Sequence, residues 1–208
     1  VSMSKKLLRA LALLAGILLV PALARPTPWS LGGGGILVFF GEVIRVWASG
    51  HLMRSQELTT SGPYAYMRDP LYLGRVLLLI GFCVMAWGNA WILLIIGLGV
   101  FFFNYMPRKY RKEMTRLEDL YGDEYMQYAA YALSLLHRLK RYPKARLRSW
   151  SFDLIWKENR EQYFLSGGVI LALALVGLYL YRKCFDGLVR SPKTPFSVIP
   201  AEAGIQEY

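Results

Sequence analysis

The chain has 208 residues, is 55% hydrophobic and carries a formal net charge of +11. Its apolar residues form long unbroken runs rather than an amphipathic pattern, which indicates a membrane protein and argues against one ordinary soluble domain. The basic residues lie beside these runs, where the positive-inside bias and anionic lipid account for them, so a nucleic-acid partner is not expected. The two cysteines, Cys83 and Cys184, offer neither a disulfide framework nor the ligand spacing of a metal site.

Five apolar segments approach or meet the roughly 20 residues that a helix needs to cross a hydrocarbon core about 30 Å thick. Only Gly88 and Asn89 separate the third segment from the fourth, which predicts a tight helical hairpin. The sequence therefore predicts an all-α fold, a polytopic transmembrane bundle of about five membrane helices with further helices on the cytoplasmic side. The segments are residues 7–24, 31–49, 71–87, 90–105 and 163–181.

The first 30 residues are either an N-terminal membrane helix or a signal-like segment. Lys5, Lys6 and Arg9 precede an apolar stretch that ends in small residues, as in a secretory signal with its cleavage site. We favour a retained helix. Under either interpretation residues 25–30 lie outside, the second helix runs inward, and residues 50–70 and 106–162 face the cytoplasm. The excess of Lys and Arg over Asp and Glu in residues 106–162 agrees with this orientation.

The second apolar segment contains two unusual features. Four consecutive glycines at residues 32–35 provide a surface without side chains, which favours the close approach of another helix over a role in ligand binding. Glu42 and Arg45 follow at an i, i+3 spacing. Ionisable groups in lipid are costly unless they are paired or functional, so the two residues form either a structural pair, which is the simpler hypothesis, or the polar wall of a cavity.

Residues 61–74 read Ser-Gly-Pro-Tyr-Ala-Tyr-Met-Arg-Asp-Pro-Leu-Tyr-Leu-Gly and place charge, aromatic rings and two prolines directly before the third apolar segment. A rigid polar turn at a membrane surface is a good candidate for the wall of a site. For Tyr64, Tyr66 and Tyr72 the alternative to a role in such a site is anchoring at the membrane interface, and anchoring is favoured for Tyr66. Arg68 either binds the carboxylate of a ligand or clamps a lipid phosphate.

A polar region follows the hairpin. After Pro107 the sequence predicts a helix over residues 108–121 that ends at Gly122, and a second helix over residues 123–139. Tyr125, Tyr128 and Tyr131 recur every three residues in the second helix, a stripe more typical of packing or interfacial anchoring than of chemistry. Because the hairpin returns the chain to its starting side, residues 61–74 and 108–128 are expected to converge on one pocket.

The C-terminal part predicts an interfacial segment plus an extra membrane helix over residues 146–183, and a disordered tail over residues 184–208. A basic stretch at residues 140–148 suits a surface facing anionic lipid, and Trp150, Phe152 and Trp156 suit an aromatic belt. His51 and His137 are isolated and are interpreted as structural or surface residues.

The two polar stretches together resemble the isoprenylcysteine carboxyl methyltransferase-like and phospholipid methyltransferase superfamily of integral-membrane enzymes. Residues 62–74 look like its Gly-Pro-Tyr, Arg-His-Pro, Tyr, Gly pattern. Residues 113–128 are similar to its Glu-Glu, Leu, Phe-Gly, Tyr, Tyr pattern. The resemblance covers roughly residues 35–145, so we expect a methyltransferase-like membrane core at residues 31–145, in which cytoplasmic helices cover a cofactor pocket.

The resemblance implies S-adenosylmethionine as the cofactor, held between the Gly-Pro-Tyr turn and the later polar helix. It also implies catalytic roles for Arg108 and Glu113, in which Arg binds a carboxylate and Glu orients or deprotonates the attacking group. From the residues alone the two are equally well interpreted as solvated surface charges, because Lys109 and Arg116 lie within four positions of Glu113. The residues expected to bind the cofactor are Gly62, Pro63, Tyr64, Arg68, Asp69, Pro70, Tyr72 and Tyr125.

Two positions depart from the family pattern, since Asp69 replaces its usual His and Met114 replaces the second of its paired acids. Two functions are therefore considered. One is the transfer of a methyl group to a lipophilic acceptor, such as a prenyl-type thiol or carboxylate, a phospholipid amine or a small thiol. The other is a non-catalytic membrane scaffold or small-molecule binder that retains the fold. The expected location is a bacterial inner membrane, with the lipid bilayer as partner and the oligomeric state undetermined.

Overall fold

The computed structural model describes residue 19 and residues 22–53, 56–135 and 138–190. Every regular element among these residues is a helix, so the predicted all-α class is confirmed. Three helical stretches, Pro28–Ser49, Ala90–Tyr131 and Gln162–Gly187, are long and apolar enough to cross a membrane, and Pro70–Ala86 is a shorter apolar helix. Most of the first predicted segment at residues 7–24 lies outside the described residues, as do His137 and residues 191–208.

Helix α2 (Pro28–Ser49) begins at a capping box, in which the Thr27 side chain accepts from the Ser30 amide and the Ser30 side chain accepts from the Thr27 amide. Pro28 occupies the first helical position, where a missing amide hydrogen costs nothing. The cap fixes the start of the helix, and Gly50 follows its end.

Helix α3 (Pro70–Ala86) packs closely on α2 through glycines of both helices. A Cβ added to Gly34 would lie 2.5 Å from the Met85 amide nitrogen, and one added to Gly74 would lie 2.9 Å from the Gly41 carbonyl oxygen. Within the glycine run only Gly34 makes such an approach, because a Cβ at Gly32, Gly33 or Gly35 would meet nothing within 4 Å. The expected packing role of the run therefore belongs to one of its four glycines.

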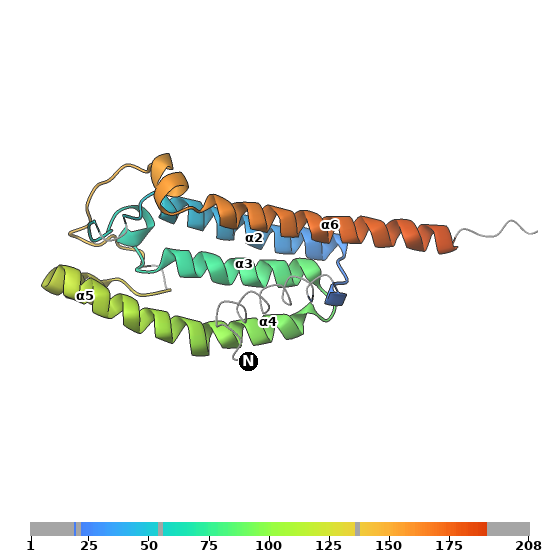
Figure 1. Ribbon diagram of the computed structural model, residues 1–208, viewed down its shortest axis with the longest axis horizontal. Coiled ribbons are helices and arrows are strands. Elements are labelled where there is room, and N and C mark those ends of the chain that lie inside the picture. The colour runs from blue at the N-terminus through green and yellow to red at the C-terminus, as the bar shows by residue number, and fades with distance from the viewer. Residues whose placement is uncertain (1–18, 20–21, 54–55, 136–137, 191–208) are drawn as a thin grey trace, which may run out of the picture.

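The predicted hairpin joins α3 to α4 (Ala90–Gly99). Trp87 and Gly88 both have positive φ, at 50° and 59°, and the Ala90 amide donates to the Trp87 carbonyl at 3.1 Å. This turn sends α4 back along α3, so the two ends of the hairpin return to one side of the molecule (Figure 1).

The chain does not break between the fourth apolar segment and the polar helix, contrary to the predicted start at residue 108. A π-helix, η2 (Val100–Tyr105), connects α4 directly to α5 (Met106–Tyr131). Proline lacks an amide hydrogen and its ring clashes with the carbonyl four residues earlier in an α-helix, and the wider π turn directly before Pro107 relieves that conflict.

Helix α5 bends at Gly122, which has φ 48° and ψ −126°. The glycine was predicted to end one helix before a second begins, and its non-helical backbone separates two helical halves of α5, as predicted. The second half ends at Tyr131 rather than at residue 139. The physical reason is that the Leu133 and Ser134 carbonyls accept from the Arg68 and Asp69 amides, which requires an extended chain there.

Helix α6 (Gln162–Arg190) follows the short π-helix η3 (Leu154–Glu158) and lies beside α2, with α3 between α2 and α4 (Figure 1). It continues into the predicted tail, so residues 184–190 are helical. Arg45, only 1% exposed, hydrogen-bonds to Glu161 just before α6 and lies 3.9 Å from Glu42. The predicted Glu42–Arg45 pair is therefore part of a larger cluster that binds α6 to the core.

Candidate active site

The turn that carries the Gly-Pro-Tyr sequence is a 3₁₀ helix, η1 (Gly62–Ala65). Gly62 has φ +57°, and a Cβ there would lie 2.3 Å from the His51 ring, so the position requires glycine for two reasons. The buried Tyr128 hydroxyl donates to the Tyr64 carbonyl at 2.7 Å. The Tyr142 amide donates to the Ala65 carbonyl at 2.8 Å. The second half of α5 and the chain after it therefore hold the turn in place.

Arg68 and Asp69 form a polar cluster between the turn and α5. The Asp69 carboxylate accepts from the Ser134 hydroxyl at 2.6 Å and pairs with the Arg68 guanidinium at 3.4 Å. Arg68 also donates to the Tyr110 hydroxyl at 2.7 Å, with its guanidinium carbon 4.9 Å from the centre of that ring. Burial raises the pKa of Asp69, and the Ser134 hydrogen bond and Arg68 oppose that rise.

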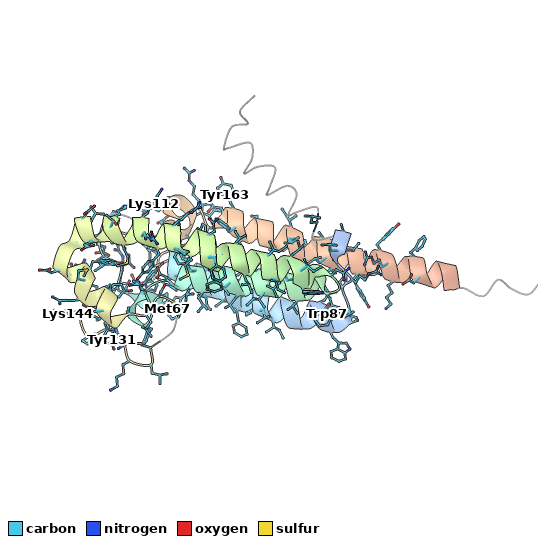
Figure 2. All side chains as sticks on the ribbon, turned by 90° about the horizontal axis from the view of Figure 1, so that it is seen from below. Met67, Trp87, Lys112, Tyr131, Lys144 and Tyr163 are labelled. Atoms are coloured by element: carbon cyan, nitrogen blue, oxygen red, sulfur yellow. The ribbon has the colours of Figure 1, made fainter. Side chains whose placement is uncertain are left out.

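A cavity of about 1200 Å³ opens between residues 61–74 and α5. Both polar stretches line it, as the geometry of the hairpin predicted. Figure 2 shows the bend of α5 at this end of the molecule, with Lys112 before the bend and Tyr131 after it. The predicted site residues on the cavity wall are Tyr64, Arg68, Asp69, Tyr72, Arg108, Glu113 and Tyr125.

Three predicted cofactor residues do not line the cavity. Gly62, Pro63 and Pro70 lie behind the wall, where the glycine provides the backbone geometry of the turn and the two prolines begin η1 and α3. Both prolines are buried. Their place in the structure is to shape the wall rather than to form its surface.

Glu113 is connected to the wall by Tyr72, whose hydroxyl donates to the Glu113 carboxylate at 3.3 Å. Arg108 lies five residues earlier, about 140° around a regular helix. Both side chains nevertheless line the cavity, because it wraps around this end of α5. In the part of the chain that the structure describes, no carboxylate lies within ion-pair distance of Arg108.

Several cavity residues were not predicted from the sequence. Arg75 lies on α3 and donates to the Tyr105 hydroxyl. Asn104 and Tyr105 reach the cavity from η2. The signal for Arg75 was present, because it is a single charge inside an apolar segment, a position that usually marks a function. No local pattern marks Ser134, whose contact with Asp69 depends on how the chain folds back after α5.

The fold and this site define an α-helical integral membrane protein with a polar, aromatic-walled cavity where its apolar helices end. The family model described as phospholipid methyltransferase matches residues 33–124, which include the first polar stretch and the second as far as residue 124. The match confirms the superfamily resemblance for this part of the chain and indicates a membrane methyltransferase. No match was found among curated proteins or among solved structures.

Proposed function

We propose that this protein transfers a methyl group from S-adenosylmethionine to a lipophilic acceptor, in a site that faces the cytoplasm of a bacterial inner membrane. One observation carries the proposal: a single cavity is lined both by the Tyr64–Arg68 turn and by the α5 segment with Arg108 and Glu113. A water-soluble cofactor would reach this cavity from the aqueous side, and an apolar acceptor from between the helices.

The cavity suits the cofactor in size and in the chemistry of its wall. Its volume of about 1200 Å³ exceeds the roughly 300–1000 Å³ of common ligand pockets, which leaves room for a nucleoside and the reacting end of an acceptor. The Tyr64, Tyr72 and Tyr125 rings suit a sulfonium cation, since a π face attracts a positive charge. Arg68, tethered by Asp69 and Tyr110, is the donor assigned to the amino-acid carboxylate of the cofactor.

When bound, S-adenosylmethionine supplies an electrophilic methyl group whose sulfur leaves as a neutral thioether as the acceptor's lone pair forms the new bond. The protein's part is to align the two molecules and exclude water. An amine or thiol acceptor loses one proton overall, and Glu113 is placed to accept it, with its carboxylate oriented by the Tyr72 hydroxyl. A carboxylate acceptor loses no proton, and Glu113 then only orients it. The planar guanidinium of Arg108 donates hydrogen bonds to the acceptor molecule.

The second candidate function is a non-catalytic binder, which the replacements at Asp69 and Met114 favour. Their surroundings weaken that interpretation. Asp69 is engaged by Ser134 and Arg68, so its carboxylate replaces the family's histidine as a structural contact. Met114 packs with Leu117 against the buried cluster around Tyr125 and Tyr128 and does not line the cavity. An acid at residue 114 would face that cluster rather than the substrates.

The test uses the full-length chain in lipid nanodiscs, with cofactor titration and transfer of labelled methyl to a membrane lipid extract as two separate readouts. Glu113→Gln should bind the cofactor within about threefold of wild type and transfer methyl about 10²–10⁴-fold more slowly, the usual contribution of a general base. Glu118→Gln removes another carboxylate from an exposed position on α5 outside the cavity, and it should behave as wild type.

Failure of the wild-type protein to bind S-adenosylmethionine would overturn the proposal. Cofactor binding without transfer to any lipid fraction would favour the non-catalytic binder. Wild-type turnover in Glu113→Gln would remove Glu113 from the mechanism but leave the transferase activity standing.

A further inference from the structure

Asp69, which replaces the usual histidine of the family pattern, is held by the fold through one of its two carboxylate oxygens. The Ser134 hydroxyl donates to Oδ2 at 2.6 Å, and the Arg68 Nε atom donates to the same oxygen at 3.4 Å. Among the described residues, no donor lies within hydrogen-bond distance of Oδ1. The side chain is 17% exposed and lines the cavity. One oxygen therefore serves the fold, and the other is open to a ligand.

Ser134 is placed to fix the direction of this carboxylate. The Asp69 amide donates to the Ser134 carbonyl at 3.0 Å, and the preceding Arg68 amide donates to the Leu133 carbonyl at 2.9 Å. The backbone thus anchors the serine on the same residue that its hydroxyl contacts. A hydroxyl anchored in this way restricts the rotation of the carboxylate, as supporting hydrogen bonds do in other binding sites. Ser134 therefore keeps Oδ2 occupied and Oδ1 free.

The cavity wall is rich in cations and poor in carboxylates. Among the described residues of the wall, seven are Arg or Lys and three are Asp or Glu, namely Glu57, Asp69 and Glu113. Glu57 pairs with Arg146 at 3.3 Å and also with Arg148. An anionic group of a ligand therefore has several possible partners on this wall, whereas a cationic group has Asp69 and Glu113.

The electrostatics of these two carboxylates distinguish their roles. Burial raises the pKa of Asp69, and repulsion from Glu113 adds to that rise. A cation bound beside Asp69 would offset this repulsion and favour the ionised carboxylate. Glu113 already accepts from the Tyr72 hydroxyl, and the proposed function assigns it to the proton of the methyl acceptor. Asp69 is then the carboxylate left for a cationic group of the cofactor.

We propose that Asp69, held in place by Ser134, binds the α-ammonium group of the cofactor. An α-amino acid carries its carboxylate and its ammonium on one carbon atom. Arg68 and Asp69 present the two complementary charges side by side, with Nε and Oδ2 3.4 Å apart. The family's histidine accepts a hydrogen bond only as a neutral ring, without this attraction between charges. The inference rests on the proposed function and adds Ser134 to the site as a positioning residue.

The experiment measures binding to the full-length chain in lipid nanodiscs, with S-adenosylhomocysteine as probe, because it keeps the amino-acid end of the cofactor and transfers no methyl group. The matched ligand is its desamino analogue, in which hydrogen replaces the α-amino group. Wild type should bind S-adenosylhomocysteine about tenfold or more tightly than the analogue, as expected for a hydrogen bond between charged groups.

Asp69→Asn keeps the shape of the side chain and an oxygen that can accept from Ser134, but it removes the charge. It should weaken S-adenosylhomocysteine binding about tenfold or more and leave the affinity for the desamino analogue within about threefold. Asp119→Asn removes an exposed carboxylate of α5 that does not line the cavity, and it should change neither affinity.

Ser134→Ala tests the positioning role and keeps the experiment informative if Asp69→Asn does not fold. It should weaken S-adenosylhomocysteine binding several-fold and spare the desamino analogue. Ser134→Thr keeps the hydroxyl and should bind S-adenosylhomocysteine within about threefold of wild type. A merely structural role of Ser134 would instead weaken both ligands alike.

Equal affinity of the wild-type protein for the two ligands, or equal losses for both ligands in Asp69→Asn and Ser134→Ala, would overturn the ammonium contact and leave the proposed function standing. Unchanged S-adenosylhomocysteine affinity in Ser134→Ala would remove Ser134 as a positioning residue. If the wild-type protein binds neither S-adenosylhomocysteine nor S-adenosylmethionine, the proposed function fails, and this inference fails with it.

Discussion

At the scale of single residues, the polar groups around the cavity depend on partners distant in sequence. The Tyr128 hydroxyl donates a hydrogen bond to the Tyr64 carbonyl, and the Ser134 hydroxyl donates one to the Asp69 carboxylate. The first contact joins the two polar stretches, and the second joins the first stretch to the chain that follows α5. A buried polar group without a partner costs about 1–3 kcal/mol, so such contacts specify which parts of the chain must meet.

His51 illustrates the same dependence and leads to a prediction on pH. It is 6% exposed, its ring packs on Gly62, and its Nδ1 atom lies 3.3 Å from the Ser61 hydroxyl. Burial and the nearby Arg148 lower the pKa of His51. The folded protein therefore binds this proton less tightly than the unfolded chain, whose histidine titrates near about 6.5, and stability falls as the pH drops below that value.

The thermal midpoint of the wild-type protein in detergent should decrease between about pH 7.5 and about pH 5.5, and that of His51→Gln should decrease less. Above about pH 7.5 the His51 ring is neutral in both the folded and the unfolded protein, so it no longer makes stability depend on pH. An equal decrease in the two proteins would show that His51 does not carry the effect.

At the scale of elements, glycines decide where helices meet and where they bend. The run at residues 32–35 provides a direct comparison, because Gly34 faces α3 and its neighbours face open space. The same residue type therefore has a packing role at one position and none at the next. Only the rotation of α2 against α3 distinguishes them.

Gly34→Ala should destabilise the protein by about 1–3 kcal/mol or more, because the new methyl group would collide with backbone atoms of α3 that cannot easily move. Gly33→Ala, the matched control one residue earlier, should be neutral. The thermal midpoint in detergent measures both. Equal effects of the two substitutions would contradict the observed α2–α3 interface.

Gly122 sets the direction of the second half of α5. Its φ of 48° with ψ of −126° is a conformation that L side chains rarely adopt, although a Cβ would meet nothing within 4 Å. Gly122→Ala should cost about 1–3 kcal/mol through backbone strain alone. It should also weaken cofactor binding, since Tyr125 and Tyr128 follow the bend.

Gly99→Ala is the control for that substitution, because Gly99 is helical and also has no atom within 4 Å of a Cβ. It should not reduce stability. A fully stable Gly122→Ala protein with normal cofactor affinity would show that the bend is not required for the site.

At the scale of the whole molecule, α6 is joined to the family-matched core by charge as well as by apolar packing. Glu161, 4% exposed, binds Arg45, and the Arg45 guanidinium carbon lies 4.5 Å from the centre of the Phe164 ring. At the other end of the bundle, Leu175 belongs to a buried cluster with Met85 and Ala90. Helix α6 therefore contacts the core at its start, through Glu161 and Phe164, and again at Leu175.

Glu161→Ala should destabilise the protein by about 3–5 kcal/mol, because it leaves the buried Arg45 without its main partner. The double variant Arg45→Met with Glu161→Leu should recover most of that loss, since it removes both buried charges. Glu158→Ala, at an exposed position before α6, should have little effect. Thermal midpoints decide the outcome, and a double variant no more stable than Glu161→Ala would contradict the pairing.

The sequence by itself determined the helices, the hairpin at Gly88 and the two polar stretches, because apolar run length, glycine and proline act locally. It also indicated that Tyr64, Arg68, Arg108 and Glu113 would converge, since a hairpin must return the chain. Only the tertiary structure decided that Ser134 engages Asp69, that Glu161 pairs with Arg45 and that Arg75 faces the cavity. Those contacts depend on helix rotation and on segments far apart in the chain, which no local pattern of residues encodes.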